Sequence, residues 1–123
     1  MKLKRKIDGD SIFIVDENGS AILTIKVTTG ENAVTIVVSG SITHDAAPDF
    51  EDELMSVLTS GRGDVIIDFS ALEHISAPAL RALLAVQKLV DDKRYQFYIK
   101  KNISDSVKVI FESTGFIDLI EIR

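Results

Sequence analysis

The sequence predicts an α/β domain in which helices pack on a mixed β-sheet. Strand-like and helix-like segments alternate from residue 33 to the end of the chain, as in domains built from a sheet covered by helices. Residues 64–69 are short and apolar in the middle, which is typical of a parallel strand buried on both faces. With 123 residues, 46% of them hydrophobic, the chain can bury one core of its own.

The first part of the chain reads as short strands joined by turns. Strands are expected over residues 2–7 and 11–15, with Asp8-Gly9-Asp10 as the turn between them. After a second turn at Asn18-Gly19, residues 22–28 and 33–42 alternate apolar and polar side chains, as strands with one buried face do. We therefore expect an N-terminal β extension over residues 1–21, as a strand or hairpin, before a domain over residues 22–123. Such an extension could form a homodimer by edge pairing.

Residues 46–60 form the first expected helix. Pro48 fits its first turn, and acidic residues crowd its N-terminal half, where the helix dipole favours them. Asp45 stands where it could cap this helix. The apolar stripe at helical spacing consists of Phe50, Leu54, Val57 and Leu58.

The rest of the chain continues the alternation. After the strand over residues 64–69, we expect a helix over 77–92, a strand over 95–100 and a helix over 104–112, before the closing segment 116–122. Ser76 stands at the N-cap position of the second helix. A helix start accepts a phosphate readily, but an ordinary cap is the simpler role for this serine.

Composition excludes several classes of function. The net charge is −5, and residues 7–60 hold one basic residue, Lys26, against ten acidic ones, which disfavours nucleic acid and suits a basic protein partner. The chain has no cysteine and two histidines, so we expect no disulfide, no metal site and no cofactor. Apolar runs are too short for a membrane span or a signal peptide, so a cytoplasmic location is expected.

Enzyme activity is not expected from the residues. The chain has no glycine-rich phosphate loop and no G-x-S-x-G motif. Asp68, His74 and Ser76 could be drawn as a hydrolase triad, but nothing in their spacing aims them at one another. His44 and Asp45 could be an acid/base pair, although both belong to the loop that enters the first helix.

Three segments together resemble the STAS family, the domain of anti-sigma factor antagonists. They are Val37-Val38-Ser39-Gly40-Ser41-Ile42, the run from Val65 to Ser76 followed by Leu80-Arg81-Ala82-Leu83-Leu84, and the final stretch from Val107 to Ile120. The resemblance covers about residues 22–122. It implies a mixed sheet with helices on one side, and a bacterial regulator of transcription that binds an anti-sigma factor of the serine kinase type and so frees a sigma factor.

The resemblance also implies a phosphorylation switch at the start of the second helix, and this sequence departs from it there. Ala77 stands at the family's phosphoacceptor position, so phosphorylation is lost or shifted to Ser76. The expected partner-binding surface joins the loop Thr43-His44-Asp45 to the start of the second helix, at Ser76, Ala77, Pro78 and Arg81. A STAS scaffold or a sensory module that binds a small ligand is the alternative function.

Overall fold

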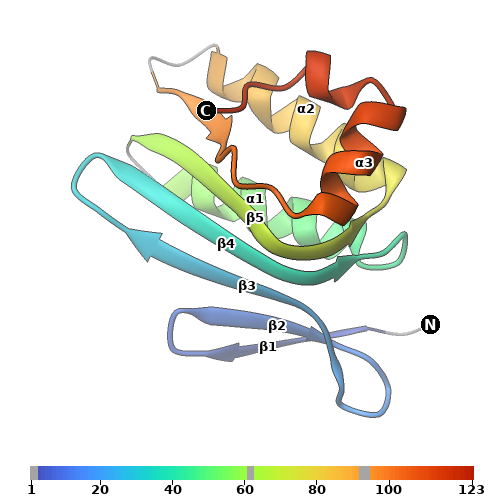
Figure 1. Ribbon diagram of the computed structural model, residues 1–123. Coiled ribbons are helices and arrows are strands. Elements are labelled where there is room, and N and C mark those ends of the chain that lie inside the picture. The colour runs from blue at the N-terminus through green and yellow to red at the C-terminus, as the bar shows by residue number, and fades with distance from the viewer. Residues whose placement is uncertain (1–2, 61–62, 92–94) are drawn as a thin grey trace.

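The computed structural model describes residues 3–60, 63–91 and 95–123 (Figure 1). The expected start of the first strand at Lys2 and the expected end of the second helix at Asp92 lie outside the described residues. Within them, the order of elements is four strands, a helix, a strand, a helix, a strand and a helix, with a short 3₁₀ turn near the end. The predicted alternation of strands and helices is confirmed.

One mixed sheet of six strands runs through the molecule in chain order, from β1 to β6. The first four strands pair antiparallel, and β4, β5 and β6 pair parallel. Parallel neighbours need a crossover, and the two long helices supply it. The strands are β1 (Lys4–Asp8), β2 (Ser11–Val15), β3 (Ala21–Thr29), β4 (Ala33–Ile42), β5 (Asp64–Ile75) and β6 (Phe97–Ile99).

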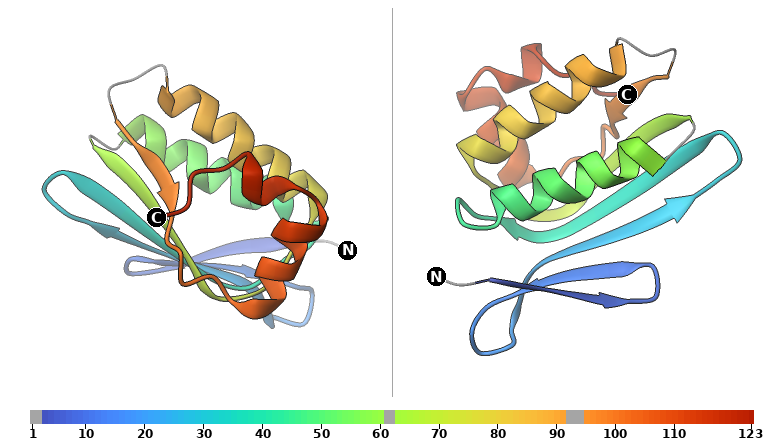
Figure 2. Two further views of the ribbon diagram at one scale, coloured as in Figure 1. Left: turned by 45° about the horizontal axis from the view of Figure 1, so that its top comes forward. Right: turned by 180° about the vertical axis from the view of Figure 1, so that it is seen from behind.

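The helices cover one face of this sheet, as predicted. Helices α1 (Ala47–Ser60) and α2 (Ala77–Asp91) lie side by side on one face of the sheet, and α3 (Asp105–Ser113) packs against β5 (Figure 2). The 3₁₀ turn η1 (Phe116–Asp118) follows α3. Phe111 of α3 lies edge-on to Phe69 of β5, with ring centroids 6.2 Å apart, and also contacts Phe116. This aromatic cluster fixes the last helix to the same face as the other two.

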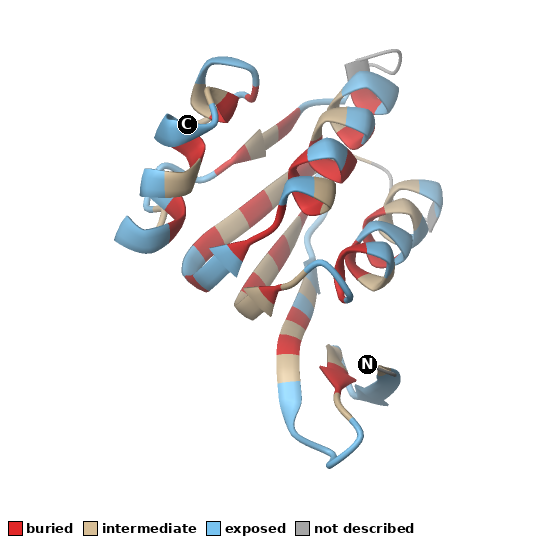
Figure 3. Cartoon of the chain, turned by 90° about the vertical axis from the view of Figure 1, so that its right-hand side faces the viewer, coloured by how far each residue is buried: buried red, intermediate tan, exposed pale blue. Residues whose placement is uncertain are grey.

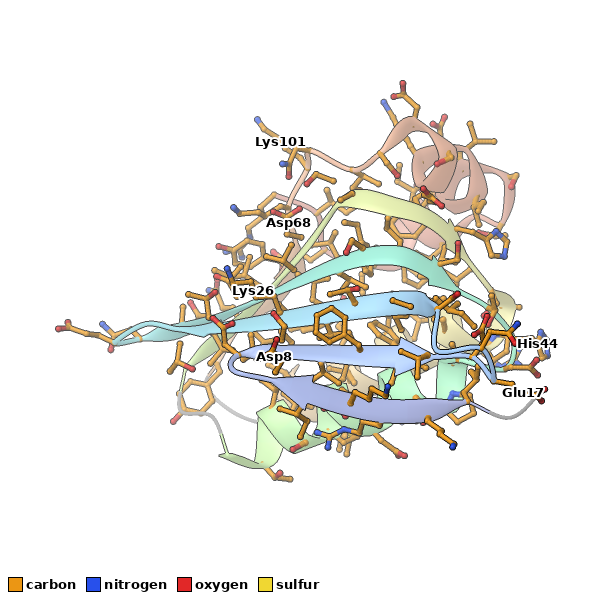
Figure 4. All side chains as sticks on the ribbon, turned by 90° about the horizontal axis from the view of Figure 1, so that it is seen from below. Asp8, Glu17, Lys26, His44, Asp68 and Lys101 are labelled. Carbon is orange, nitrogen blue, oxygen red and sulfur yellow. The ribbon has the colours of Figure 1, made fainter. Side chains whose placement is uncertain are left out.

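Burial alternates along the strands because only one face is covered. Figure 3 shows buried bands crossing the strands beneath the helices. On β4, Val34, Ile36 and Val38 are buried, whereas the residues between them are half-buried. Seen from below in Figure 4, the other face of the sheet has no helix over it. The expectation that β5 is buried on both faces is wrong, since Ile66 on the open face is only half-buried.

Strand β5 is also longer than the sequence indicated. It runs from Asp64 to Ile75, past the expected end at Phe69. Its register against β4 shifts twice, between Val37 and Ser39 and between Gly40 and Ser41, and each shift adds one residue to β5. Extra residues of this kind bend a strand and interrupt its alternation. For that reason the apolar pattern after Phe69 does not look like a strand.

The N-terminal extension is a β-hairpin that adds two strands to one edge of the sheet. Gly9 has a φ of +63°, which a tight hairpin turn requires and glycine adopts without strain. Every residue of β1 is exposed, whereas Ile14 of β2 belongs to the core. Arg5 of β1 forms an ion pair with Glu53 of α1, whose side chain is only 8% exposed. A buried carboxylate needs such a partner, so this pair fixes the hairpin to α1.

Candidate partner-binding site

The two segments of the expected binding surface meet at one end of the sheet. Strands β4 and β5 are parallel neighbours, and their last residues, Ile42 and Ile75, are register partners. The backbone N–H of Ser76 donates to the carbonyl of Ile42 at 2.9 Å. The loop Thr43-His44-Asp45 and the start of α2 therefore leave the sheet side by side, as predicted.

Gly40 shapes the end of β4 that leads into this loop. Its φ is +92°, and a Cβ built on it would lie 2.3 Å from the carbonyl oxygen of Ile22 on β3. A backbone contact this close leaves no room for a side chain, and the positive φ would strain any other residue. Gly40 also stands at the second register shift between β4 and β5. It therefore lets β4 bend toward the loop while β3 stays in contact.

Thr43 closes the turn that leads into α1, and the expected cap at Asp45 is not formed among the described residues. The Thr43 hydroxyl accepts a hydrogen bond from the N–H of Ala46 at 3.1 Å, and its carbonyl accepts one from the N–H of Ala47 at 3.0 Å. A threonine hydroxyl that accepts a nearby backbone N–H holds a turn in this way. Because Thr43 performs this role, His44 and Asp45 are left exposed on the loop.

Ser76 occupies the corresponding position before α2, but its hydroxyl is not bonded there. Its carbonyl accepts from the N–H of Leu80 at 3.1 Å, as an N-cap carbonyl should. Its Oγ is buried and has no hydrogen-bond partner among the described residues. A capping side chain bonds to the N–H of the second or third helical residue; the second, Pro78, has none, and the third, Ala79, has one that the Ser76 hydroxyl does not bind. The predicted cap is therefore present in the backbone and absent in the side chain.

Ser76 is less exposed than the other predicted binding residues at the start of α2. Ala77 and Arg81 are exposed and Pro78 is half-buried, whereas Ser76 is only 7% exposed. A methyl group thus faces solvent at the position where the STAS resemblance puts a serine, and the adjacent serine points inward. Covalent modification of Ser76 would require the start of α2 to open.

Two further residues belong to this end of the molecule, and sequence reasoning did not include them. Glu73 and His74 are exposed, and His74 is the register partner of Ser41, next to the end of β4. They were missed because β5 was expected to end at Phe69. The signal that could have placed them is the pair of buried residues Leu72 and Ile75, which continue the strand through the extra residue between them.

Acidic groups line the start of α1 beside the loop. Partial burial, together with the nearby charges of Asp52 and Glu53, raises the pKa of Asp49 above its ordinary value. No acidic residue lies in the first turn of α2. The two helix starts therefore differ in charge, and Arg81 of α2 adds a cation close to its own helix start.

The residues that could be drawn as a triad are not assembled. One oxygen of Asp68 accepts from the N–H of Ser70 at 2.9 Å. Burial alone would raise the pKa of Asp68, but the hydrogen bonds from Ser70 and the charge of Lys100 outweigh it and lower that pKa. Because the hydroxyl of Ser76 has no partner in the described part of the chain, it has no base that could activate it.

Over the described ranges, no three acidic or histidine side chains gather as metal ligands would. No helix in those ranges has both the length and the apolar character that crossing a membrane demands.

The model of the STAS domain family matches residues 24–123 of this chain. The chain therefore belongs to the STAS domain family, and the resemblance read from its motifs is confirmed. The matched region begins within β3 and leaves out the N-terminal hairpin. No curated protein sequence matches the chain.

Solved structures of anti-sigma factor antagonists share this fold. An anti-sigma factor antagonist from Mycobacterium paratuberculosis superposes with a TM-score of 0.71 at 22% identity, covering 81% of this chain and 84% of that one. The antagonist SpoIIAA in its unphosphorylated form gives a TM-score of 0.66 at 15% identity, covering 80% and 87%. RsbS from Moorella thermoacetica gives 0.64 at 18% identity, covering 80% and 85%. At these identities the likeness establishes the fold.

Proposed function

We propose that this protein is an anti-sigma factor antagonist that binds an anti-sigma factor of the serine kinase type and thereby releases a sigma factor. The observation that carries the proposal is the joined surface formed by the loop Thr43-His44-Asp45 and the start of α2 at the ends of two parallel strands. Structural neighbours with the same fold are anti-sigma factor antagonists. On this proposal the protein acts by binding, without catalysis of its own, in the cytoplasm.

We further propose that binding lacks the usual phosphorylation switch. Ala77 has no hydroxyl and faces solvent, so the surface that a kinase would reach offers no acceptor at this position. Ser76, the shifted acceptor, holds its hydroxyl in the interior. A phosphoryl group would bring about two negative charges to a contact surface. Without an acceptor, the complex would persist when its partner has ATP.

The proposal is tested with a purified kinase-type anti-sigma factor that the chain captures from the native cell. Ala77→Glu places a charge at the centre of the contact surface and should weaken binding by at least about 100-fold, the effect of burying an unpaired charge. Ala77→Ser should accept phosphate from ATP and then dissociate, whereas the natural chain should do neither. The matched control is Lys26→Glu, on the open face of the sheet, which should leave affinity unchanged.

Three outcomes would argue against this proposal. Equal affinity of the natural chain and Ala77→Glu would place the contact elsewhere. Phosphate recovered on Ser76 from native cells would replace the switchless form with a shifted switch. Capture of only itself, or of a sensory complex without such a kinase, would favour the scaffold or ligand-binding alternative.

The ligand-binding alternative has less structural support. One cavity among the described residues, between the C-terminal ends of α1 and α2, holds about 120 Å³ and is lined by Met55, Leu58, Thr59, Leu89 and Val90. Pockets for drug-sized ligands are usually about 300–1,000 Å³. This cavity is also at the opposite end of the helices from the loop and from Ala77. We therefore place protein binding ahead of small-ligand binding.

A further inference from the structure

The N-terminal hairpin leaves one edge of the sheet open. All five residues of β1 are exposed, and no described segment pairs with its outer side. The opposite edge of the sheet, at β6, is covered. The chain's own end covers β6, where Ile122 forms a parallel bridge with Ile99 and the N–H of Arg123 donates to the carbonyl of Ile99 at 2.9 Å. An uncovered edge strand is a template for pairing with another chain.

The hairpin turn determines which backbone groups face that edge. Asp8 and Ser11 flank a two-residue turn and are register partners. The pair that closes such a turn exchanges both ladder hydrogen bonds, and the bonding side then alternates along the strand. The N–H and C=O groups of Arg5 and Ile7 therefore point outward, where a further strand would bind them.

Along this edge, cationic side chains precede Ile7 and anionic side chains follow it. Lys4 and Lys6 precede Ile7, and Asp8 and Asp10 follow it. Ile7 itself is 60% exposed, although it is a large apolar residue on a strand. A sequence with cations on one side of a central apolar residue and anions on the other is complementary to itself when it runs antiparallel.

We propose that two copies of this chain pair β1 with β1, antiparallel, about a twofold axis at Ile7. In this register Ile7 faces Ile7 of the second copy, and Lys6 of each copy faces Asp8 of the other. Lysines on an edge strand ordinarily oppose pairing, but here each central lysine gains an aspartate. The register centred on Lys6 would oppose two lysines, and the one centred on Asp8 would oppose two aspartates. Charge therefore selects Ile7 as the centre.

The ion pair behind the hairpin is compatible with this arrangement. Arg5 is bound to Glu53 of α1, on the face of the sheet that carries the helices. In the Ile7-centred register Arg5 stands opposite Gly9, which has no side chain to displace it. The pair also fixes the hairpin before association, which reduces the ordering cost of binding. Two five-residue strands bury less than a standard interface, so the dimer is expected to be weak and dependent on concentration.

Sedimentation equilibrium of the full chain tests the proposal, which does not depend on the anti-sigma function. Lys6→Asp and Asp8→Lys each replace two opposite-charge pairs with two like-charge pairs, and each should raise the dimer Kd by at least about tenfold. An equimolar mixture of the two variants should restore dimers, because K6D on one copy then faces D8K on the other. The matched control, Lys26→Asp on β3, should associate like the natural chain.

Other results would overturn the proposal. A natural chain that stays monomeric up to millimolar concentration excludes the dimer. Variants K6D and D8K that dimerise like the natural chain show that another surface is used. A mixture that stays as dissociated as its components contradicts the Ile7-centred register. Ile7→Lys, which puts two cations together at the axis, should abolish dimers while circular dichroism shows the fold unchanged.

Discussion

The starts of α1 and α2 are built from the same sequence signal, yet they differ in structure. Each helix follows one of two neighbouring parallel strands, and each is preceded by a residue with a hydroxyl, Thr43 or Ser76. The Thr43 hydroxyl accepts a backbone N–H at 3.1 Å, whereas the Ser76 hydroxyl is buried without a partner among the described residues. Pro78 removes one of the two N–H groups that Ser76 could have bonded, whereas the N–H of Ala79, the counterpart of the Ala46 N–H, is present and is still not bonded to the Ser76 hydroxyl.

The two helix starts also differ in charge. Asp49 lies in the first turn of α1, where a carboxylate offsets the positive end of the helix dipole. The first turn of α2 has no acidic residue. The start of α1 therefore carries acidic charge of its own, whereas the start of α2 retains its partial positive charge. A helix start left in this state suits contact with a partner, as the proposed function requires.

The largest expected loss of stability is at the start of α1. Thr43→Ala removes the hydrogen bond that closes the turn before α1 and should lower the free energy of unfolding by about 1 kcal/mol, the usual net contribution of one such hydrogen bond. Urea denaturation followed by circular dichroism measures it. Thr43→Ser keeps a hydroxyl at the same place and should recover most of the loss. Equal stability of Thr43→Ala and the natural chain would show that the hydrogen bond to Ala46 contributes nothing.

A smaller effect is expected from the charge at the start of α1. The pKa of Asp49 is raised in the fold, so stability is lost as the pH rises from the ordinary pKa of aspartate through the raised one, and the carboxylate is less favourable folded than unfolded above that range. Asp49→Asn should therefore raise the free energy of unfolding at pH 7 by about 0.5 kcal/mol, a typical limit for a surface substitution. Below about pH 4, where aspartates are protonated, the gain should vanish.

Denaturation curves of Asp49→Asn and the natural chain from pH 3 to pH 7 measure this difference. The matched control is Asp105→Asn in the first turn of α3, where the exposed carboxylate has only the favourable helix dipole to lose. That variant should be less stable at pH 7, which is the opposite sign. A loss of stability in both variants would mean that the dipole outweighs burial and repulsion at Asp49.

The sequence was sufficient for what depends on regular patterns. Alternating and helical periods located the helices and the strands up to Phe69, and the STAS motifs placed the two loops at one end of the sheet. The sequence was insufficient where one extra residue in a strand shifts its pairing register. The two register shifts hid the second half of β5, and with it the exposed Glu73 and His74. Capping was predicted only in part: Asp45 does not cap α1, and Ser76 caps α2 with its carbonyl but not with its hydroxyl.

The last effect is that of Ser76, and it tests whether Pro78 contributes to the difference between the two helix starts. Ser76→Ala removes a buried hydroxyl that makes no hydrogen bond in the described structure, so the free energy of unfolding should rise, by up to about 1 kcal/mol, because the desolvation cost of that hydroxyl is removed. Pro78→Ala returns an N–H to the second helical position. In that background Ser76→Ala should cost about 0.5–1 kcal/mol, because the hydroxyl then has a group to cap. A double-mutant cycle measures the coupling. A large loss from Ser76→Ala in the natural chain would show that the hydroxyl is already bonded, whereas a zero coupling would remove Pro78 as the cause and leave the orientation of the serine itself.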